Sequence, residues 1–455
     1  MMHTLSITTK FYLHLSLIFI LIQGVSAQNH QVIDSLSQVL ETDISDKKRV
    51  DTYNSIAQEY SYTDSLATSK YVNQAIELAE QISYSEGKID ALYTIAWSIA
   101  VKGYPADAEM RYKRIIQKAD SMGYTSGKAR AYDRMGVCAI IQGRGKEALD
   151  YFNRSLEIYE KLGDQRGIAN TSNSLGLGYS GQADYKKSRY YFNQSLEIRE
   201  KLGPKREMAR VLINISSTFG IEGNYRKQLD YTLRALLISK ELGDSVALHN
   251  TYYALGTFYK NQGEYDKALE NFKNSLKISQ NVNRGGMATS ISQIGKIFLI
   301  QKDYEKANEY FIQFLELAKE LANKTLIVSA YANLGDVHEA EGEYLTAMSY
   351  YEKALGIAEE IGALSTRNTL LISVGKIHMK EGKPLLAKKY LEEALRISQE
   401  IGDLKNIKEA AYQLSEVEQV LGNYQSAYDK HVLYKQYADS LFNEDQTKAI
   451  ARLEA

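Results

Sequence analysis

Residues Asn333 to Leu355 have the sequence NLGDVHEAEGEYLTAMSYYEKAL, in which small and large side chains alternate at helical spacing. Gly335 and Ala347 are the small positions, and large apolar residues lie three and four positions from one another. The helical pattern is interrupted at Gly342, because glycine readily adopts the left-handed conformation that ends a helix. The stretch therefore predicts two antiparallel helices, A and B, that approach closely through their small residues.

The same pattern recurs along most of the chain. The small residue of helix A returns every 39 or 40 residues, at Ala57, Ala96, Gly136, Gly176, Ser216, Gly256, Gly295, Gly335, Gly375 and Ser415. Ten repeats with one period and almost no insertions indicate a solenoid, in which each helix pair buries its apolar face against its neighbours.

The residues that connect the helices support these predicted helix boundaries. A Leu-Gly-Asp motif at 162–164 and again at 242–244 predicts a glycine that ends helix B and an aspartate that caps the next helix A. Pro105 and Pro384 fall at predicted starts of helix B, and Pro204 at a start of helix A. These are the positions where a helix tolerates proline.

On these residues the chain resembles tetratricopeptide repeat (TPR) proteins, of the kind whose repeats are about 40 residues long. Gly145 and Pro384 depart from the tyrosine expected at the turn. The resemblance implies an all-α, right-handed superhelical solenoid whose A helices line a concave groove for a peptide or a partner's helix. The chain is also similar to the exported N-terminal TPR region of sensor and signalling proteins of the Bacteroidota type.

The composition agrees with a folded helical protein. Only three prolines occur among 455 residues, and the 35 tyrosines favour helices packed through aromatic side chains. The formal net charge is −1, so there is no global basic field to collect phosphates, and we expect no nucleic-acid partner.

The N-terminal segment of the chain predicts export. An apolar run from Phe11 to Val25 follows Lys10 and ends in small residues, so residues 1–27 are predicted to be a signal peptide cleaved after Ala27. An uncleaved N-terminal anchor is the alternative.

We expect a cap helix within 28–44, the repeats over 45–441, and the start of a C-terminal linker helix over 442–455. That the chain is truncated there is a hypothesis. No membrane insertion is expected in the mature chain, although a transmembrane helix beyond residue 455 is left open.

No catalytic, cofactor or metal site is predicted. His338 and His378 occupy positions that are aromatic in other repeats, which favours packing over ligation. One cysteine, Cys138, cannot supply a multi-cysteine metal site and has no histidine nearby. The Gly143–Lys146 segment lacks the glycine loop and the Ser or Thr of a phosphate site, and is predicted to be a turn.

The predicted groove positions lie three before, one after and four after each small residue. They are apolar in early repeats and charged in later ones, which separates two candidate surfaces. Asn214 and Asn333, two before their small residues, match a position where related TPR proteins hold a peptide backbone. The candidate partner-binding residues are Tyr93, Trp97, Val137, Ile140, Leu177, Ile213, Asn214, Tyr253, Lys260, Lys296, Asn333, Asp336, Glu339 and Lys376. Trp97 is the candidate anchor, with packing between repeats as the alternative.

The sequence therefore predicts an exported TPR scaffold that binds a protein or peptide partner, as the sensing region of a signal-transduction protein. Two alternatives stay open. One is part of an enzyme, a histidine kinase or nucleotide cyclase, whose catalytic module lies beyond residue 455. The other is a structural assembly adaptor.

Overall fold

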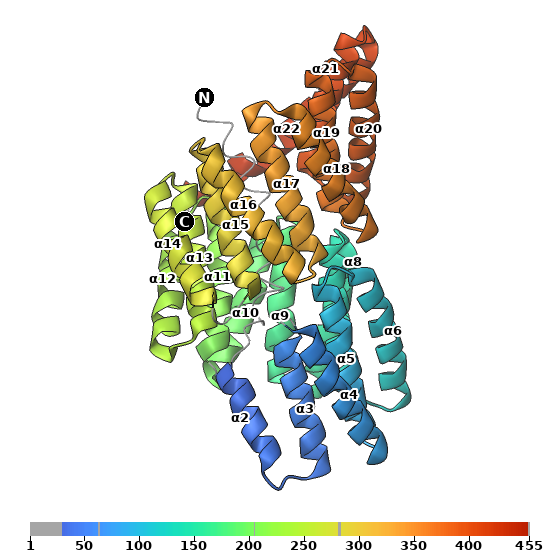
Figure 1. Cartoon of the computed structure of the whole chain (residues 1–455), viewed down its shortest axis with the longest axis vertical. Helices are drawn as coiled ribbons and strands as arrows, with labels where there is room; N and C mark the ends of the chain where they lie inside the picture. The colour runs from blue at the N-terminus through green and yellow to red at the C-terminus, as the bar shows by residue number, and fades with distance from the viewer. Residues whose placement is uncertain (1–29, 62–63, 204, 281–283, 454–455) are drawn as a thin grey trace. The chain divides into compact units, whose positions relative to one another are not determined.

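A computed structural model describes residues 30–61, 64–203, 205–280 and 284–453. These residues form 21 helices and no strand (Figure 1). The helices are α2 (His30–Glu41), α3 (Asp46–Tyr60), α4 (Ser65–Gln81), α5 (Ser85–Val101), α6 (Pro105–Ser121), α7 (Thr125–Ile141), α8 (Gly145–Leu162), α9 (Gln165–Gly181), α10 (Tyr185–Leu202), α11 (Lys205–Ile221), α12 (Tyr225–Leu242), α13 (Ser245–Asn261), α14 (Tyr265–Ser279), α15 (Arg284–Ile300), α16 (Tyr304–Glu320), α17 (Lys324–Glu341), α18 (Tyr344–Glu360), α19 (Leu364–Lys380), α20 (Pro384–Ile401), α21 (Leu404–Val420) and α22 (Tyr424–Leu453).

The ten predicted repeats correspond to ten successive helix pairs, from α3 with α4 to α21 with α22, and the all-helical repeat fold is confirmed. The chain divides into two compact units. The first unit comprises residues up to 297 together with 320–323, and the second comprises 298–319 together with 324–455. Each unit has its own apolar clusters, so each is described separately below.

Close packing explains why helix A needs a small residue at its centre. A Cβ atom placed on Gly136 would lie 2.4 Å from the ring of Phe152 on α8, and one on Gly176 would lie 2.5 Å from Phe192 on α10. Gly335 meets Tyr351 in the same way in the second unit. The aromatic ring comes 16 residues after the small residue each time, so the two residues hold one hairpin together.

The predicted caps are present. Gly163 and Gly243 have φ angles of +67° and +59°, in the left-handed region. Asp164 then accepts a hydrogen bond of 3.0 Å from the backbone N–H of Gly167 and caps α9. Pro105 and Pro384 are the first residues of α6 and α20, as predicted, whereas Pro204 lies outside the described residues.

The predicted signal peptide, 1–27, also lies outside the described residues. The helix α2 falls within the segment expected to cap the repeats. At the other end α22 continues from Tyr424 to Leu453, so residues 442–453 extend the last helix of the repeats rather than beginning a new one. No glycine or proline occurs in this helix to interrupt it. Across the described part of the chain, no helix is both long enough and apolar enough to span a membrane.

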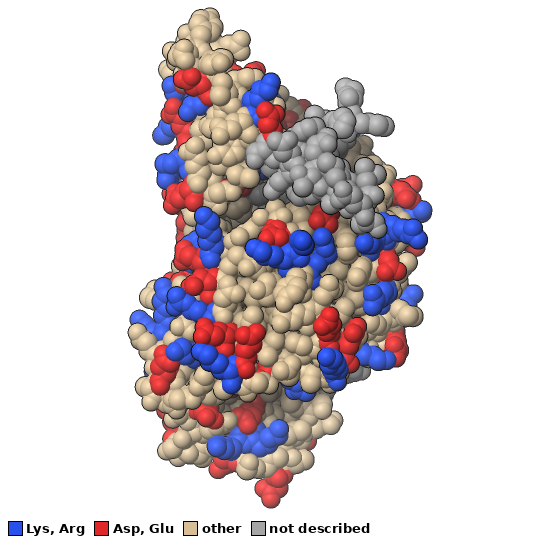
Figure 2. Space-filling view, turned by 180° about the vertical axis from the view of Figure 1, so that it is seen from behind, with Lys and Arg blue, Asp and Glu red and all other residues tan. Residues whose placement is uncertain are grey.

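Charges of both signs are interspersed on the surface. In Figure 2, lysine and arginine side chains alternate with aspartate and glutamate over the visible face. This agrees with the net charge of −1. A local concentration of one sign is therefore a distinctive feature wherever it occurs.

Candidate functional site

The first unit contains a cavity of about 420 Å³ among its A helices. Most of the lining side chains come from α5, α7, α9 and α11, whose successive members contact one another (Figure 1). The polar lining is concentrated at positions six, three and two before the small residue of each helix. These are Arg130, Asp133 and Arg134 on α7, Asn170, Asn173 and Ser174 on α9, and Arg210 and Asn214 on α11. Such spacing places them on one helical stripe.

Two arginines of α7 are held against aromatic rings. The guanidinium carbon of Arg130 lies 4.4 Å from the centroid of the Tyr93 ring, and Arg130 also pairs with Asp90. Arg134 lies over Trp97 at 4.2 Å, and its Nε donates a hydrogen bond of 2.8 Å to Oη of Tyr93. Cation–π contacts of this kind orient the guanidinium groups along the wall of the cavity.

Arg199 and Arg210 both pair with the carboxylate of Glu207. Glu207 pairs with Arg199 at 3.2 Å and with Arg210 on its own helix. Arg199 also donates a hydrogen bond of 2.8 Å to Oδ1 of Asn170. Burial, with the nearby charge of Arg210, lowers the pKa of Arg199 to about 10. Burial is the main cause of this shift, and the charge of Glu207 opposes it.

The amides form the neutral part of the site. Nδ2 of Asn214 donates a hydrogen bond of 2.9 Å to Oδ1 of Asn173. Asn214 is 1% exposed, and its Oδ1 accepts no hydrogen bond from any described residue. A buried amide oxygen without a partner carries a free-energy cost, which a ligand N–H group could remove.

The structure separates the early groove candidates into two groups. Tyr93, Leu177 and Asn214 line the cavity. In contrast, Trp97, Val137 and Ile213 are at most 3% exposed and belong to apolar clusters, and Ile140 packs against one of these clusters.

The expected apolar character of the early groove is therefore corrected, because this cavity is lined by five arginines. The position one after the small residue packs into an apolar cluster in α5 and α7, and the position three before it does so in α11. The positions six and two before the small residue line the cavity in α7, α9 and α11.

Two other candidates of the first unit contribute to a separate cluster. Tyr253 packs edge-on against Phe272, with ring centroids 5.5 Å apart. Lys260 donates a hydrogen bond of 2.6 Å to Oε1 of Gln293. Burial lowers the pKa of Lys260 to about 8. Lys296 is half-buried on the adjacent helix α15. None of the candidates Tyr253, Lys260 and Lys296 is among the residues that line the cavity.

The late candidates, all in the second unit, belong to a polar network. The Tyr351 hydroxyl lies 2.7 Å from Oδ1 of Asp336 and 3.0 Å from Oε2 of Glu339. Lys376 pairs with Glu409 at 2.6 Å. Asn333, which is 2% exposed, lies on α17 with the two carboxylates. The charged character expected for the later repeats is present, and opposite charges pair within it.

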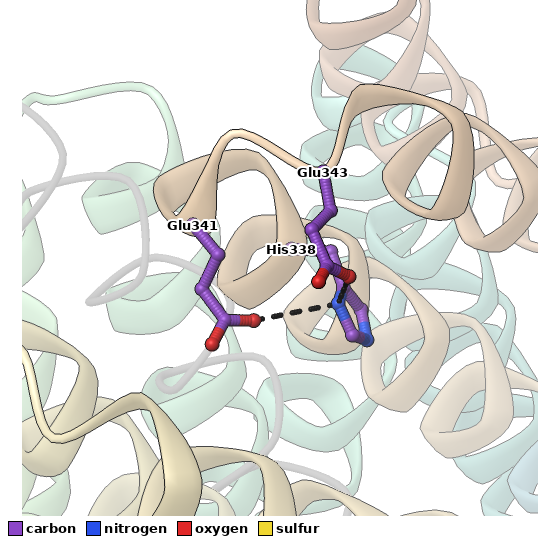
Figure 3. A group of neighbouring side chains, drawn as sticks. All are labelled: His338, Glu341 and Glu343. Carbon is purple, nitrogen blue, oxygen red and sulfur yellow. Dashed lines mark hydrogen bonds and ion pairs between the residues drawn. The ribbon is translucent and has the colours of Figure 1, made fainter.

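His338, Glu341 and Glu343 form a cluster at the turn between α17 and α18 (Figure 3). Nδ1 of His338 lies 2.9 Å from Glu343 and 3.4 Å from Glu341. The imidazole stacks on Tyr350, with ring centroids 5.4 Å apart. His378 stacks on Tyr390 in the same way, so the predicted packing role of both histidines is confirmed. The imidazole of His338 is thus held by the two carboxylates and by stacking on Tyr350.

Sequence comparison identifies the repeats. A family model described as tetratricopeptide repeat matches residues 127–201, 247–320 and 286–360, and a second model of the same description matches 369–401. The chain therefore contains tetratricopeptide repeats. No curated protein matches its sequence.

Solved structures agree on the fold. A Rap protein in complex with competence and sporulation factor is 15% identical, with a TM-score of 0.52, and the match covers 79% of this chain and 98% of that one. The quorum sensor NprR from B. thuringiensis, in its apo form, is 14% identical over 77% and 98% of the two chains, with a TM-score of 0.49. BtubC from P. vanneervenii is 24% identical over 47% and 90%, with a TM-score of 0.41. The likeness to the Rap protein concerns the fold alone.

Proposed function

We propose that the chain is an exported TPR scaffold that binds a peptide, or an extended segment of a protein, in the cavity of the first unit. The observation that carries this proposal is the buried amide of Asn214, which is among the residues that line the cavity and whose Oδ1 has no hydrogen-bond partner among the described residues. A peptide backbone supplies N–H donors and C=O acceptors at regular spacing, which suits a wall of amides. The Rap protein of similar fold was solved in complex with a factor, which is consistent with a ligand-holding solenoid.

Peptide capture tests the binding proposal. The purified chain is immobilised and exposed to a mixed library of hexapeptides that are acetylated at the N-terminus and amidated at the C-terminus. The wild-type chain should retain peptides, and Asn214→Leu should weaken retention about tenfold, because a backbone hydrogen bond is lost inside the cavity. The control is Asn153→Leu, which alters an exposed asparagine on α8.

Two results would overturn the peptide-binding proposal. One is a wild-type chain that retains no peptide; the other is an Asn214→Leu variant that retains as much as wild type. Circular dichroism of each variant would show that the helices are intact, so that a loss of retention reports on the site.

Export and a sensing role form the second part of the proposal. Export rests on the sequence of residues 1–27, and the sensing role rests on the resemblance to TPR regions of sensor proteins. Residues 1–40 would be fused to an alkaline phosphatase that lacks its own leader and is active only outside the cytoplasm. We expect active phosphatase with Gln28 as its first residue. An inactive fusion retained in the cytoplasm would contradict export, and an active fusion of full length would instead support an uncleaved anchor.

A further inference from the structure

The cavity of the first unit carries more positive than negative charge. Arg130, Arg134, Arg166, Arg199 and Arg210 line it, against two lining carboxylates, Asp133 and Glu207. Including Asp90, which pairs with Arg130 from just outside the lining, leaves a formal surplus of two positive charges. The whole chain has a net charge of −1, so this surplus is local.

The carboxylates present do not neutralise the arginines evenly. Glu207 is divided between Arg199 and Arg210. Burial raises the pKa of Asp133, which makes it a weaker counter-ion. Nε of Arg130 is buried and donates to no described residue. Arg199 is 5% exposed and lies near the guanidinium of Arg210, and both groups pair with Glu207.

We propose that this cavity selects peptides that carry an aspartate or glutamate side chain, which the arginines of α7, α9, α10 and α11 receive. The inference rests on the proposed peptide-binding function and adds the chemical class of the ligand. A guanidinium offers two parallel N–H donors that match the two oxygens of a carboxylate. The cavity is partly closed off from water, so such a pair is stronger there than on the surface.

The amide side chains of the cavity favour a peptide as the ligand. Asn170 already accepts from Arg199, and Asn214 is linked to Asn173, so the backbone-binding amides and the arginines share one hydrogen-bonded wall. A peptide whose backbone lies along α9 and α11 would place a side chain within reach of Arg199 and Arg210. A carboxylate in that place would remove the like-charge repulsion between the two guanidinium groups.

The test uses capped hexapeptide pools with a single fixed position, occupied by Asp, Glu, Asn, Gln, Lys or phosphoserine, and equal mixtures elsewhere. Capping removes the terminal charges, so selection reports on side chains alone. We expect the purified chain to retain the Asp and Glu pools about tenfold better than the Asn and Gln pools, and the preference to fall with rising salt.

Three variants locate the selection. Arg199→Gln and Arg210→Gln should each reduce the ratio of acidic to neutral pools retained about tenfold. Arg166→Gln, at an exposed residue of the lining, gives a smaller reduction with little risk to folding. Arg154→Gln is the matched control, because Arg154 is exposed on α8 and does not line the cavity.

Several outcomes overturn the proposal. Equal retention of acidic and neutral pools, lost in Asn214→Leu, would refute acid selection and leave peptide binding intact. Retention of the phosphoserine pool alone would assign the arginines to a phosphopeptide instead. Acid preference that persists in Arg199→Gln, Arg210→Gln and Arg166→Gln would place selection elsewhere. Retention of no pool would refute both the selection and the binding function on which it rests.

Discussion

The guanidinium of Arg134 covers the indole of Trp97, with its carbon 4.2 Å from the ring centroid, and leaves Trp97 only 3% exposed. Trp97 is thus part of the packing of the first unit. We expect Trp97→Ala to lower the free energy of unfolding by about 3–5 kcal/mol, since truncation leaves a cavity in an apolar cluster. Urea unfolding followed by circular dichroism measures this loss. A variant with wild-type stability and weakened peptide capture would instead restore Trp97 as a direct contact.

Two glycines of the first unit separate packing from helix propensity. Gly136→Ala places a Cβ atom 2.4 Å from Phe152, and should destabilise the chain by about 1–3 kcal/mol. Gly181→Ala meets no atom within 4 Å, and should leave stability unchanged or raise it by up to about 1 kcal/mol. Thermal and urea unfolding of the pair give the comparison. Equal effects of both substitutions would contradict the close approach of α7 and α8.

The stability of the first unit should depend on pH through His249, which is 1% exposed and bonded to Ser275 by a 2.7 Å contact at Nδ1. Burial lowers the pKa of His249 from 6.5 to about 4. The unfolded chain therefore takes up a proton first as the pH falls, so stability is full above pH 6.5 and declines toward pH 4. At about 1.36 kcal/mol per pKa unit, the loss amounts to about 3 kcal/mol.

Unfolding by urea at a series of pH values tests this dependence. His249→Gln removes the titrating group and should flatten the decline over this range, although the variant begins from a lower stability at neutral pH. His431→Gln, on α22, is the control and should keep the wild-type slope. An unchanged slope in His249→Gln would assign the pH dependence to other groups.

Cys138 reports on opening of the first unit. The thiol is fully buried, and burial raises its pKa to about 12. Because the thiolate is the reactive species, the native chain should react with iodoacetamide at pH 8 far more slowly than the chain unfolded in urea. Mass spectrometry of timed samples gives both rates. Comparable rates in the two states would contradict burial of this residue.

The repeat architecture was predictable because packing repeats. Five glycines of helix A, Gly136 among them, contact a large side chain 16 positions later, and the period of 39 or 40 residues repeats this packing along the chain. The caps at Gly163 and Asp164 followed from local chemistry alone, since a left-handed glycine and an N-capping carboxylate need only their neighbours.

The cavity was harder to predict because it depends on rotation of each helix about its axis. Among the residues chosen three before the small residue, Tyr93 lines the cavity, but the positions six and two before it were passed over except at Asn214. A signal was present, because Arg130 and Arg134 are four residues apart and therefore lie on one face of α7. Trp97 was placed in the groove by its position one after Ala96, whereas in the structure it is buried.

The wall of the cavity is assembled from matching positions of successive repeats: Arg130, Asn170 and Arg210 are spaced by 40 residues, as are Arg134, Ser174 and Asn214. Each repeat contributes one row of lining residues, so each row is encoded by its own short stretch of gene. Loss, duplication or exchange of one repeat would replace a single row and leave the remaining rows in register. Ligand preference in such a protein can therefore be inherited and altered one row at a time.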